Sequence, residues 1–234
     1  TGPAASTNNT ETFNGSSWTE TNEMNTTRFS SGSTGTYTAG IAVSGNTFTD
    51  ISREVETWNG TTWSTHPNNY DADVAEIITF GTTTAAIMAG GFDGPAPRGG
   101  SNTSVATAYS YDGSTYTSIT ALPQTLNNAT GTGSQTDAIA ITGLTTPPLS
   151  VKTSTEEWDG SSWTAGGSVN TGRYNVQNQA YGPAPAAGFV GGKNPSYNIV
   201  ALHEQYNGSS WTEVGDVPAP AWLGSSAGIQ TANI

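Results

Sequence analysis

One short motif occurs five times along the chain, and it constrains the fold more than any other feature. It consists of an aromatic residue, Asn or Asp, Gly, two residues that are Ser or Thr, and a second aromatic residue. The first aromatics of successive copies are 45, 53, 47 and 48 residues apart. Repeats of roughly 20–50 residues are typical of solenoids, propellers and arrays. The aromatic pairs are Phe13/Trp18, Trp58/Trp63, Tyr111/Tyr116, Trp158/Trp163 and Tyr206/Trp211.

Each copy of the motif predicts a β-hairpin. Asn or Asp followed by Gly supplies the positive-φ position that tight turns need. A four-residue loop places the two aromatics opposite each other, so that both side chains leave the same face of the sheet. There they can pack against the neighbouring repeat, where burial of one large aromatic contributes about 2–3 kcal/mol. We therefore interpret the motif as a packing device.

A glutamate lies two residues before the first aromatic in four of the copies, and Tyr109 takes its place in the fifth. Side chains alternate along a strand, so this glutamate points to the same face as the aromatic. An active site usually breaks the symmetry of a repeat, whereas a structural device follows it. We therefore expect a buried acceptor of N–H groups rather than a catalytic acid at Glu11, Glu56, Glu156 and Glu204.

A second motif, a short apolar strand that ends at glycine, lies between the copies of the first. It occupies residues 35–45, 81–91, 133–143 and 182–192, and a fifth copy begins at 228–234. Together with a first strand and the two strands of the hairpin, it makes a unit of four strands. Four strands in about 45 residues is the size of a propeller blade.

The order of these elements predicts one domain over residues 1–234. The N-terminal half-repeat is 1–20, the full repeats are about 27–65, 72–118, 125–165 and 172–214, and the C-terminal half-repeat is 221–234. The two halves complete a fifth blade, which leaves no free sheet edge. The junction is short: Ile41 precedes Glu56 by 15 positions, but Ile234 would precede Glu11 by only 11. We therefore expect that the chain is a part cut from a longer repetitive sequence.

These motifs resemble kelch repeats. The resemblance rests on the apolar strand ending in Gly90-Gly91 or Gly191-Gly192, the Glu-x-aromatic-[ND]-Gly segment and the later Trp, and it covers nearly the whole chain. It implies an all-β, five-bladed propeller of four-stranded antiparallel blades. The sequence of the repeats is similar to that of Thr/Ser/Gly-rich kelch-like proteins of phages and environmental bacteria. This resemblance implies a virion-associated or extracellular location. Two copies depart from Gly-Gly, at Ser44 and Thr142, and kelch propellers more often have six or seven blades.

Charge and composition exclude several classes of function. The net charge is −12, from 18 acidic and six basic residues, so the chain lacks the basic surface that nucleic acids or an anionic membrane require. No apolar run is long enough to span a bilayer. The absence of cysteine excludes disulfides and thiolate metal sites. The two histidines, His66 and His203, fall in different repeats, and we predict neither a metal nor a cofactor.

Four enzymatic or metal-binding interpretations compete with the structural one. A sialidase-type Asp box would need Asp at Trp158, and galactose oxidase, which has a kelch-like propeller, needs a cysteine that this chain lacks. A calcium loop needs oxygen ligands at alternate positions, and each motif offers a single one. A glycosidase needs paired carboxylates. The candidates near predicted inner strands are Asp71, Asp73, Glu76 and Asp137, and the segment 71–76 suits a solvated loop equally well.

Candidate ligand-binding residues are those that break the repeat symmetry where the first strands begin. Arginine next to an aromatic suits recognition of a carbohydrate or a carboxylate at the mouth of a channel. The alternative is that these aromatics fill space between inner strands. The candidates are Arg28, Phe29, Arg173, Tyr174 and Trp222, with Asp93, Arg98 and Tyr197 in loops expected on the same face.

The sequence therefore favours a non-enzymatic binding or structural module. We expect a glycan or a protein as its partner at the channel mouth, and a chain that is a monomer or part of a longer repeat protein. A glycosidase-like enzyme on a five-bladed propeller is one alternative. A purely architectural propeller, excised or engineered and without a ligand, is the other.

Overall fold

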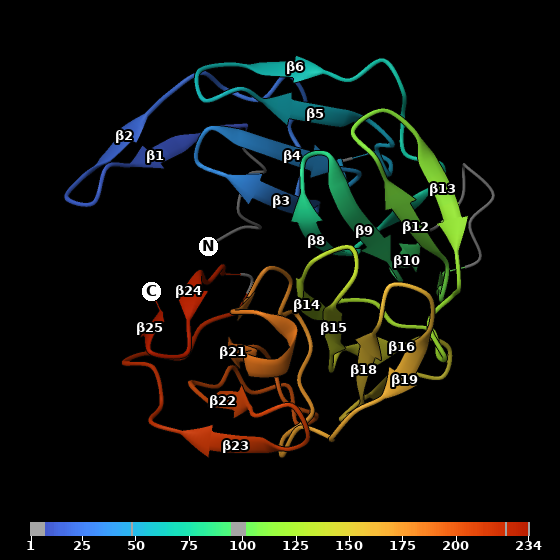
Figure 1. Ribbon diagram of the computed structural model, residues 1–234, viewed down its shortest axis with the longest axis vertical. Helices are drawn as coiled ribbons and strands as arrows, with labels where there is room; N and C mark the ends of the chain where they lie inside the picture. Colours follow the sequence, from blue (N-terminus) through green and yellow to red (C-terminus); the bar gives the residue numbers. More distant parts are fainter. Residues whose placement is uncertain (1–7, 48, 95–101, 223, 234) are drawn as a thin grey trace.

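The protein is built almost entirely of antiparallel β-strands (Figure 1). The computed structural model describes residues 8–47, 49–94, 102–222 and 224–233. Within these ranges the one helical element is a short 3-10 turn, η1 (Ala184–Ala186). None of the described helical structure is long and apolar enough to cross a bilayer.

The described residues form four four-stranded antiparallel sheets, and each follows the chain order of one predicted repeat. Sheet 1 contains β3 (Gly32–Thr36), β4 (Ala39–Val43), β5 (Val55–Trp58) and β6 (Trp63–Thr65). Sheet 2 contains β8 (Ile78–Thr82), β9 (Ala85–Ala89), β12 (Ala108–Tyr111) and β13 (Tyr116–Ile119). Sheet 3 contains β14 (Thr130–Gly133), β15 (Ala138–Ile141), β18 (Thr155–Trp158) and β19 (Trp163–Ala165). Sheet 4 contains β20 (Ala180–Tyr181), β21 (Gly188–Val190), β22 (His203–Tyr206) and β23 (Trp211–Val214).

The four sheets succeed one another around a common centre (Figure 1). The first strand of each sheet lies innermost, and the last strand lies on the outside of the molecule. This all-β arrangement of four-stranded antiparallel sheets is compatible with a propeller.

In the second and third repeats short strands form two additional small sheets. One of these strands, at Val74–Ala75, precedes the first strand of sheet 2, and the others lie in loops between second and third strands. One group is a three-stranded sheet and the other a two-stranded one. They are β7 (Val74–Ala75), β10 (Phe92–Asp93) and β11 (Thr103–Ser104), and β16 (Leu144–Thr145) with β17 (Ser150–Val151). In the first and fourth repeats isolated bridges take the place of these short strands, and they join Phe29 to Asn46 and Tyr174 to Lys193. In each repeat, the segment that leads into the first strand therefore lies beside the loop between the second and third strands.

The two ends of the chain form separate hairpins on either side of one gap between sheets 1 and 4 (Figure 1). The N-terminal hairpin is β1 (Glu11–Phe13) with β2 (Trp18–Glu20), and the C-terminal hairpin is β24 (Gly228–Ile229) with β25 (Ala232–Asn233). Closure of the ring would require β25 to pair with β1. In the part of the chain that the structure describes, each hairpin is a sheet of its own.

All five aromatic pairs lie directly opposite each other across their hairpins, as the motif predicts. In the third sheet Trp158 faces Trp163 with ring centroids 5.1 Å apart. The Gly160 φ of 94° is the left-handed conformation that the turn requires. The Asp159 carboxylate accepts the backbone N–H groups of Ser161 and Ser162, both at 2.8 Å. Equivalent side-chain contacts close the turns at Asn14, Asn59, Asp112 and Asn207.

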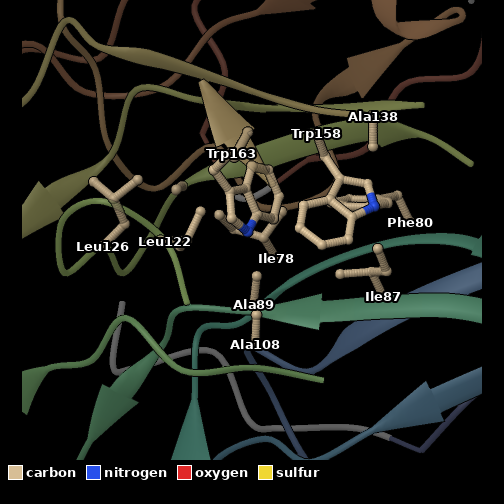
Figure 2. Packing of buried hydrophobic residues seen from close by; sticks show 12 residues of the cluster. Ile78, Phe80, Ile87, Ala89, Ala108, Leu122, Leu126, Ala138, Trp158 and Trp163 are labelled. Carbon is tan, nitrogen blue, oxygen red and sulfur yellow. The ribbon is translucent and has the colours of Figure 1, made fainter. Parts of the chain in front are cut away.

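The aromatic pair of a complete sheet packs against the preceding sheet (Figure 2). Trp163 meets Phe80 of β8 edge to face, with ring centroids 6.4 Å apart. Ile78 and Ile87 belong to the same buried cluster. Because these rings bridge two sheets, they bury the apolar faces that a single four-stranded sheet would leave in water.

The first copy of the motif differs from the others in its exposure. Trp18 is 66% exposed, whereas its equivalent Trp163 is 8% exposed. The hairpin forms, but no preceding sheet covers its aromatic pair in the described structure. The local and the packing roles of the motif are therefore separable.

Candidate functional site

The innermost strands surround a central cavity of about 460 Å³. Its lining is mostly glycine, serine and threonine from β3, β8, β14 and β20, together with the segment that leads into β24. None of the described residues that line it is a carboxylate. The lining residues are Ser33–Gly35, Thr79–Gly81, Gly131–Gly133, Asn178, Ala180–Pro183 and Ser225–Ile229.

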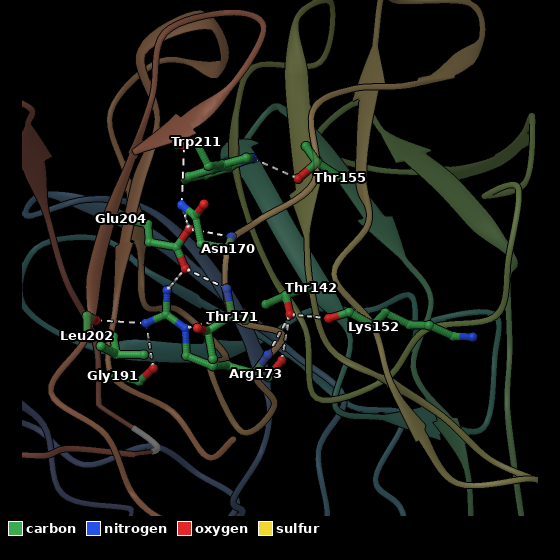
Figure 3. A network of polar contacts seen from close by, with 10 residues as sticks. All are labelled: Thr142, Lys152, Thr155, Asn170, Thr171, Arg173, Gly191, Leu202, Glu204 and Trp211. Carbon is green, nitrogen blue, oxygen red and sulfur yellow. Dashed lines mark hydrogen bonds and ion pairs between the residues drawn. The ribbon is translucent and has the colours of Figure 1, made fainter. Parts of the chain in front are cut away.

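The glutamates of the repeat are buried acceptors in the complete sheets. Glu204 of β22 accepts the backbone N–H groups of Asn170 at 2.8 Å and Thr171 at 3.3 Å (Figure 3). These residues belong to the segment that enters sheet 4. Glu56 of β5 binds the N–H groups of Asn25 and Thr26 in the same way. The carboxylate therefore ties the incoming chain to the third strand of its own sheet.

Arg173 completes this buried network, and its side chain is fully buried. Its guanidinium donates to Glu204 at 2.8 Å and to the carbonyl oxygens of Gly191 and Leu202 at 3.0 and 2.7 Å (Figure 3). Its central carbon lies 3.8 Å from the ring centroid of Phe189. Burial lowers the pKa of Arg173 to about 10, against the opposing effect of Glu204. The structure thus places this candidate inside the protein.

Arg28 occupies the equivalent position in sheet 1 and pairs with Glu56. It also donates to the carbonyl oxygens of Ser44 and Glu54. In sheet 3 the role of the arginine falls to Gln124, whose amide donates to Glu156 at 2.8 Å. The predicted arginines are thus parts of ion pairs that recur in the repeat.

Three of the predicted aromatics make two contacts beside sheet 4. Tyr174 and Tyr197 meet edge to face with centroids 6.4 Å apart. The Lys193 ammonium lies 3.7 Å from the ring centroid of Trp222. The backbone of Lys193 also pairs with that of Tyr174, which links the two contacts. We call Tyr174, Lys193, Tyr197 and Trp222 the aromatic platform.

The platform remains accessible: Tyr197 is 66% exposed and Trp222 is 40% exposed. Tyr197 has a φ of 66°, which is unfavourable for a residue with a side chain. The Asn194 side chain holds this loop by accepting the N–H groups of Ser196 and Asn198. The loop therefore presents the Tyr197 ring in a defined position.

Two chain segments that carry platform residues also contribute to the lining of the central cavity. The segment after Tyr174 reaches the cavity at Asn178, and the segment after Trp222 reaches it at Ser225. The two segments are joined where the N–H of Ser226 donates to the Asn178 carbonyl at 2.9 Å.

The other predicted ligand residues lie elsewhere. Phe29 is exposed beside sheet 1 and pairs with Asn46, so it occupies the position that Tyr174 has in sheet 4. Asp93 lies on β10. Arg98 lies outside the described residues. Lys193 was not predicted from the sequence; the one signal for it is its place directly after Gly191-Gly192, at the edge of the apolar strand.

The predicted carboxylates are spread over different environments. Asp73 pairs with Arg53 at 3.6 Å, and Asp71 and Arg53 line one surface pocket. Glu76 is bonded by the Asn128 amide, and burial raises the pKa of Glu76 to about 7. Asp137 lines a different and smaller cavity.

That smaller cavity, of about 170 Å³, lies between sheets 3 and 4 and contains three acidic residues. They are Asp137, Glu157 and Asp159. Glu157 accepts the Tyr206 hydroxyl. The turn N–H groups and the serine hydroxyls lower the pKa of Asp159 to about 2. Asp159 thus closes the hairpin turn, and Glu157 accepts a hydrogen bond across the interface between sheets 3 and 4.

Both histidines contact a tyrosine. Nε2 of His203 contacts the Tyr181 hydroxyl, and Nε2 of His66 lies 3.1 Å from that of Tyr111. Throughout the described ranges, no three His, Asp or Glu residues are grouped in a way that could hold a metal ion.

No protein-family model matches this sequence, and no curated protein matches it.

Proposed function

We propose that the chain forms a five-bladed, kelch-like β-propeller, closed by a blade shared between its termini, and that this propeller is a non-enzymatic module that binds a glycan. Two sets of contacts support the shared blade. The aromatic platform supports the binding function.

The N-terminal hairpin contacts sheet 1 as one complete sheet contacts the next. The indole N–H of Trp63 donates to the Thr10 hydroxyl at 2.8 Å, and that of Trp211 donates to the Thr155 hydroxyl at 3.0 Å. Thr10 and Thr155 both directly precede the motif glutamate. This shared contact supports the proposal that the hairpin is the outer half of a preceding blade.

The C-terminal hairpin contacts sheet 4 as the first two strands of sheet 3 contact sheet 2. The Gln135 side chain, in the β14–β15 turn, donates to the carbonyl oxygens of Ala86 and Tyr111 in sheet 2. Gln230, in the β24–β25 turn, donates to those of Ala187 and Tyr206 in sheet 4. This shared contact supports the proposal that the hairpin is the inner half of a following blade.

The two hairpins together supply the inner and outer halves of a fifth blade. A groove of about 520 Å³ runs beside β1 and is lined by Phe13, Trp18, Tyr37 and Trp58, among others. It is the place that a second strand would take if it paired with β1 as β4 pairs with β5. Closure in this way would also satisfy two free sheet edges.

The glycan-binding proposal rests on two contacts, the edge-to-face pair of Tyr174 with Tyr197 and the contact of Lys193 with Trp222. The Lys193 backbone pairs with that of Tyr174, and Tyr197 and Trp222 are exposed. Aromatic rings carry large apolar faces with a polar handle at one end, and the apolar faces of sugar rings stack on them. The hydrogen bonds of Asn194 hold the backbone of the Tyr197 loop, which reduces the entropy lost when a ligand binds. The central cavity, whose described lining has no carboxylate, favours binding over hydrolysis.

A glycan array followed by calorimetry on the best ligand tests this proposal. Trp222→Ala and Tyr197→Ala should each reduce affinity at least tenfold while the melting temperature stays within a few degrees. Phe29→Ala removes an exposed aromatic at the equivalent place of sheet 1 and serves as the matched control. If no glycan binds the parent protein, or if Phe29→Ala weakens binding as much as Trp222→Ala, the proposal fails.

A further inference from the structure

We infer that the glycan bound by the aromatic platform carries a carboxylate, and that the Lys193 ammonium recognises it. This inference rests on the proposed function, because it names the class of sugar that the same site takes.

Lys193 differs from Arg28, Arg53 and Arg173 in its partners, because its ammonium lies on an aromatic ring. Arg28 and Arg173 are buried in ion pairs with glutamates, and Arg53 pairs with Asp73. Within the described residues no carboxylate pairs with Lys193. Its ammonium carries three donors and no acceptor, so it can bind an anion while it rests against Trp222.

The position of Lys193 is fixed by its backbone rather than by its side chain alone. Its N–H donates to the Tyr174 carbonyl at 2.9 Å, and its carbonyl accepts the Tyr174 N–H at 3.0 Å. Its backbone also bridges to Ile199, on the far side of the loop that carries Tyr197. The Lys193 backbone is thus held between Tyr174 and the loop of Tyr197, and its ammonium lies over the Trp222 ring.

The net charge of −12 opposes the approach of an anion at long range. At physiological salt, however, charges farther apart than about 8 Å are largely screened. The contact with Lys193 therefore decides between an acidic and a neutral sugar.

The equivalent position in sheet 1 provides an internal comparison. There the partner of Phe29 is Asn46 instead of lysine. A neutral amide in this place maintains the backbone pairing, so the pairing does not require a cation at position 193. The positive charge is thus dispensable for the local fold.

Calorimetry with a matched pair of oligosaccharides tests the inference. One ends in glucuronic acid and the other in glucose, so that the two differ at C6 alone. The parent protein should bind the acidic ligand at least tenfold more tightly in 50 mM salt, and this preference should shrink at 500 mM. Lys193→Gln should lose this preference, so that it binds the two ligands with equal affinity. Lys152→Gln, which removes a base from a different repeat, should retain the preference.

Each result has a distinct meaning. Equal affinity for the two ligands in the parent protein overturns the inference and leaves the glycan-binding proposal intact. A preference for the acidic ligand that survives Lys193→Gln also overturns it, because another group would then recognise the carboxylate. If neither ligand binds and no glycan of the array binds, both the proposed function and this inference are refuted.

Discussion

The Thr10 hydroxyl accepts a hydrogen bond from the indole N–H of Trp63 at 2.8 Å, across the boundary between the N-terminal hairpin and sheet 1. The same contact joins Thr155 to Trp211 between sheets 3 and 4. Sheet 2 has Ala108 at this position, and there the indole of Trp163 donates to the Thr120 carbonyl instead. A buried indole N–H needs a partner, and the chain supplies one at each of these boundaries.

We predict that a disulfide can close the fifth blade. Alignment with sheet 1, where Gly40 pairs with Trp58, places Asn233 opposite Phe13. Directly paired residues have Cα atoms about 4.5–5.5 Å apart, which a disulfide can span. The chain has no cysteine, so Phe13→Cys/Asn233→Cys forms no competing bonds. Mild oxidation should yield a cross-linked monomer with altered mobility in a non-reducing gel.

Ser16→Cys/Asn233→Cys is the control for this closure, because Ser16 lies in the turn of the hairpin. It should remain reduced under the same conditions. Cross-linked dimers from the Phe13 pair would show instead that the hairpins of two copies join, and the absence of any cross-link would refute the shared blade.

The tryptophan pair of sheet 3 should contribute strongly to stability. Trp163 is buried against Phe80 and Ile78 of sheet 2, so Trp163→Ala removes contacts on both sides of the interface. We expect a loss of about 3–5 kcal/mol in the free energy of unfolding, as for large aromatic truncations in cores. Urea denaturation measures it. Leu149→Ala, at an exposed position, should change stability by less than about 0.5 kcal/mol.

Arg173 should be required for stability rather than for ligand contact. Arg173→Met leaves the Glu204 carboxylate buried without its counter-charge, which costs about 3–5 kcal/mol for a broken buried pair. The double variant Arg173→Met/Glu204→Met removes both charges and should recover part of this loss. A stable Arg173→Met protein that has lost glycan binding alone would contradict the structural role.

Glu76 should make the protein less stable as pH rises. Its pKa is raised from 4.5 to about 7 by burial, so between these values the folded state holds a proton that the unfolded state has released. The stabilisation from the protonated carboxyl is complete below about pH 4.5 and is lost as pH rises through about 7. Glu76→Gln should therefore be more stable than the parent at pH 8 and similar to it at pH 4.5.

Urea denaturation at several pH values between 4.5 and 8 checks this prediction. Burial lowers the pKa of His203, which contributes the opposite slope, but His203 is present in both proteins and cancels in the comparison. Glu213→Gln, at an exposed position of β23, is the control. Parallel stability curves for the parent and Glu76→Gln would exclude Glu76 as the titrating group.

The local parts of the fold were predictable because they depend on neighbours in sequence. The turn at Asp159-Gly160 determines the register of its hairpin, and the register sets Trp158 opposite Trp163. The role of Glu204 followed from its repetition, since a residue that recurs in nearly every repeat serves the repeat.

The non-local parts were not predictable from the same patterns. Arg173 and Glu204 are 31 positions apart, and nothing in either local segment indicates that they meet. The place of Lys193 beside Trp222 depends on how the loop after β21 pairs with the segment before β20. The exposure of Trp18 depends on what lies beyond its hairpin, which the motif itself does not encode.

The contact between Glu204 and the N–H groups of Asn170 and Thr171 has a consequence for how such chains can change in length. When each repeat is counted from the segment that leads into it, the anchor and the segment that it holds lie within one repeat, as they do for Glu56 with Asn25 and Thr26. A duplication or deletion of one whole repeat in the gene would therefore add or remove each glutamate together with the segment that it binds. Neither would be left without its partner. Ancestors and descendants of this chain could differ in repeat number without the loss of a single one of these internal anchors.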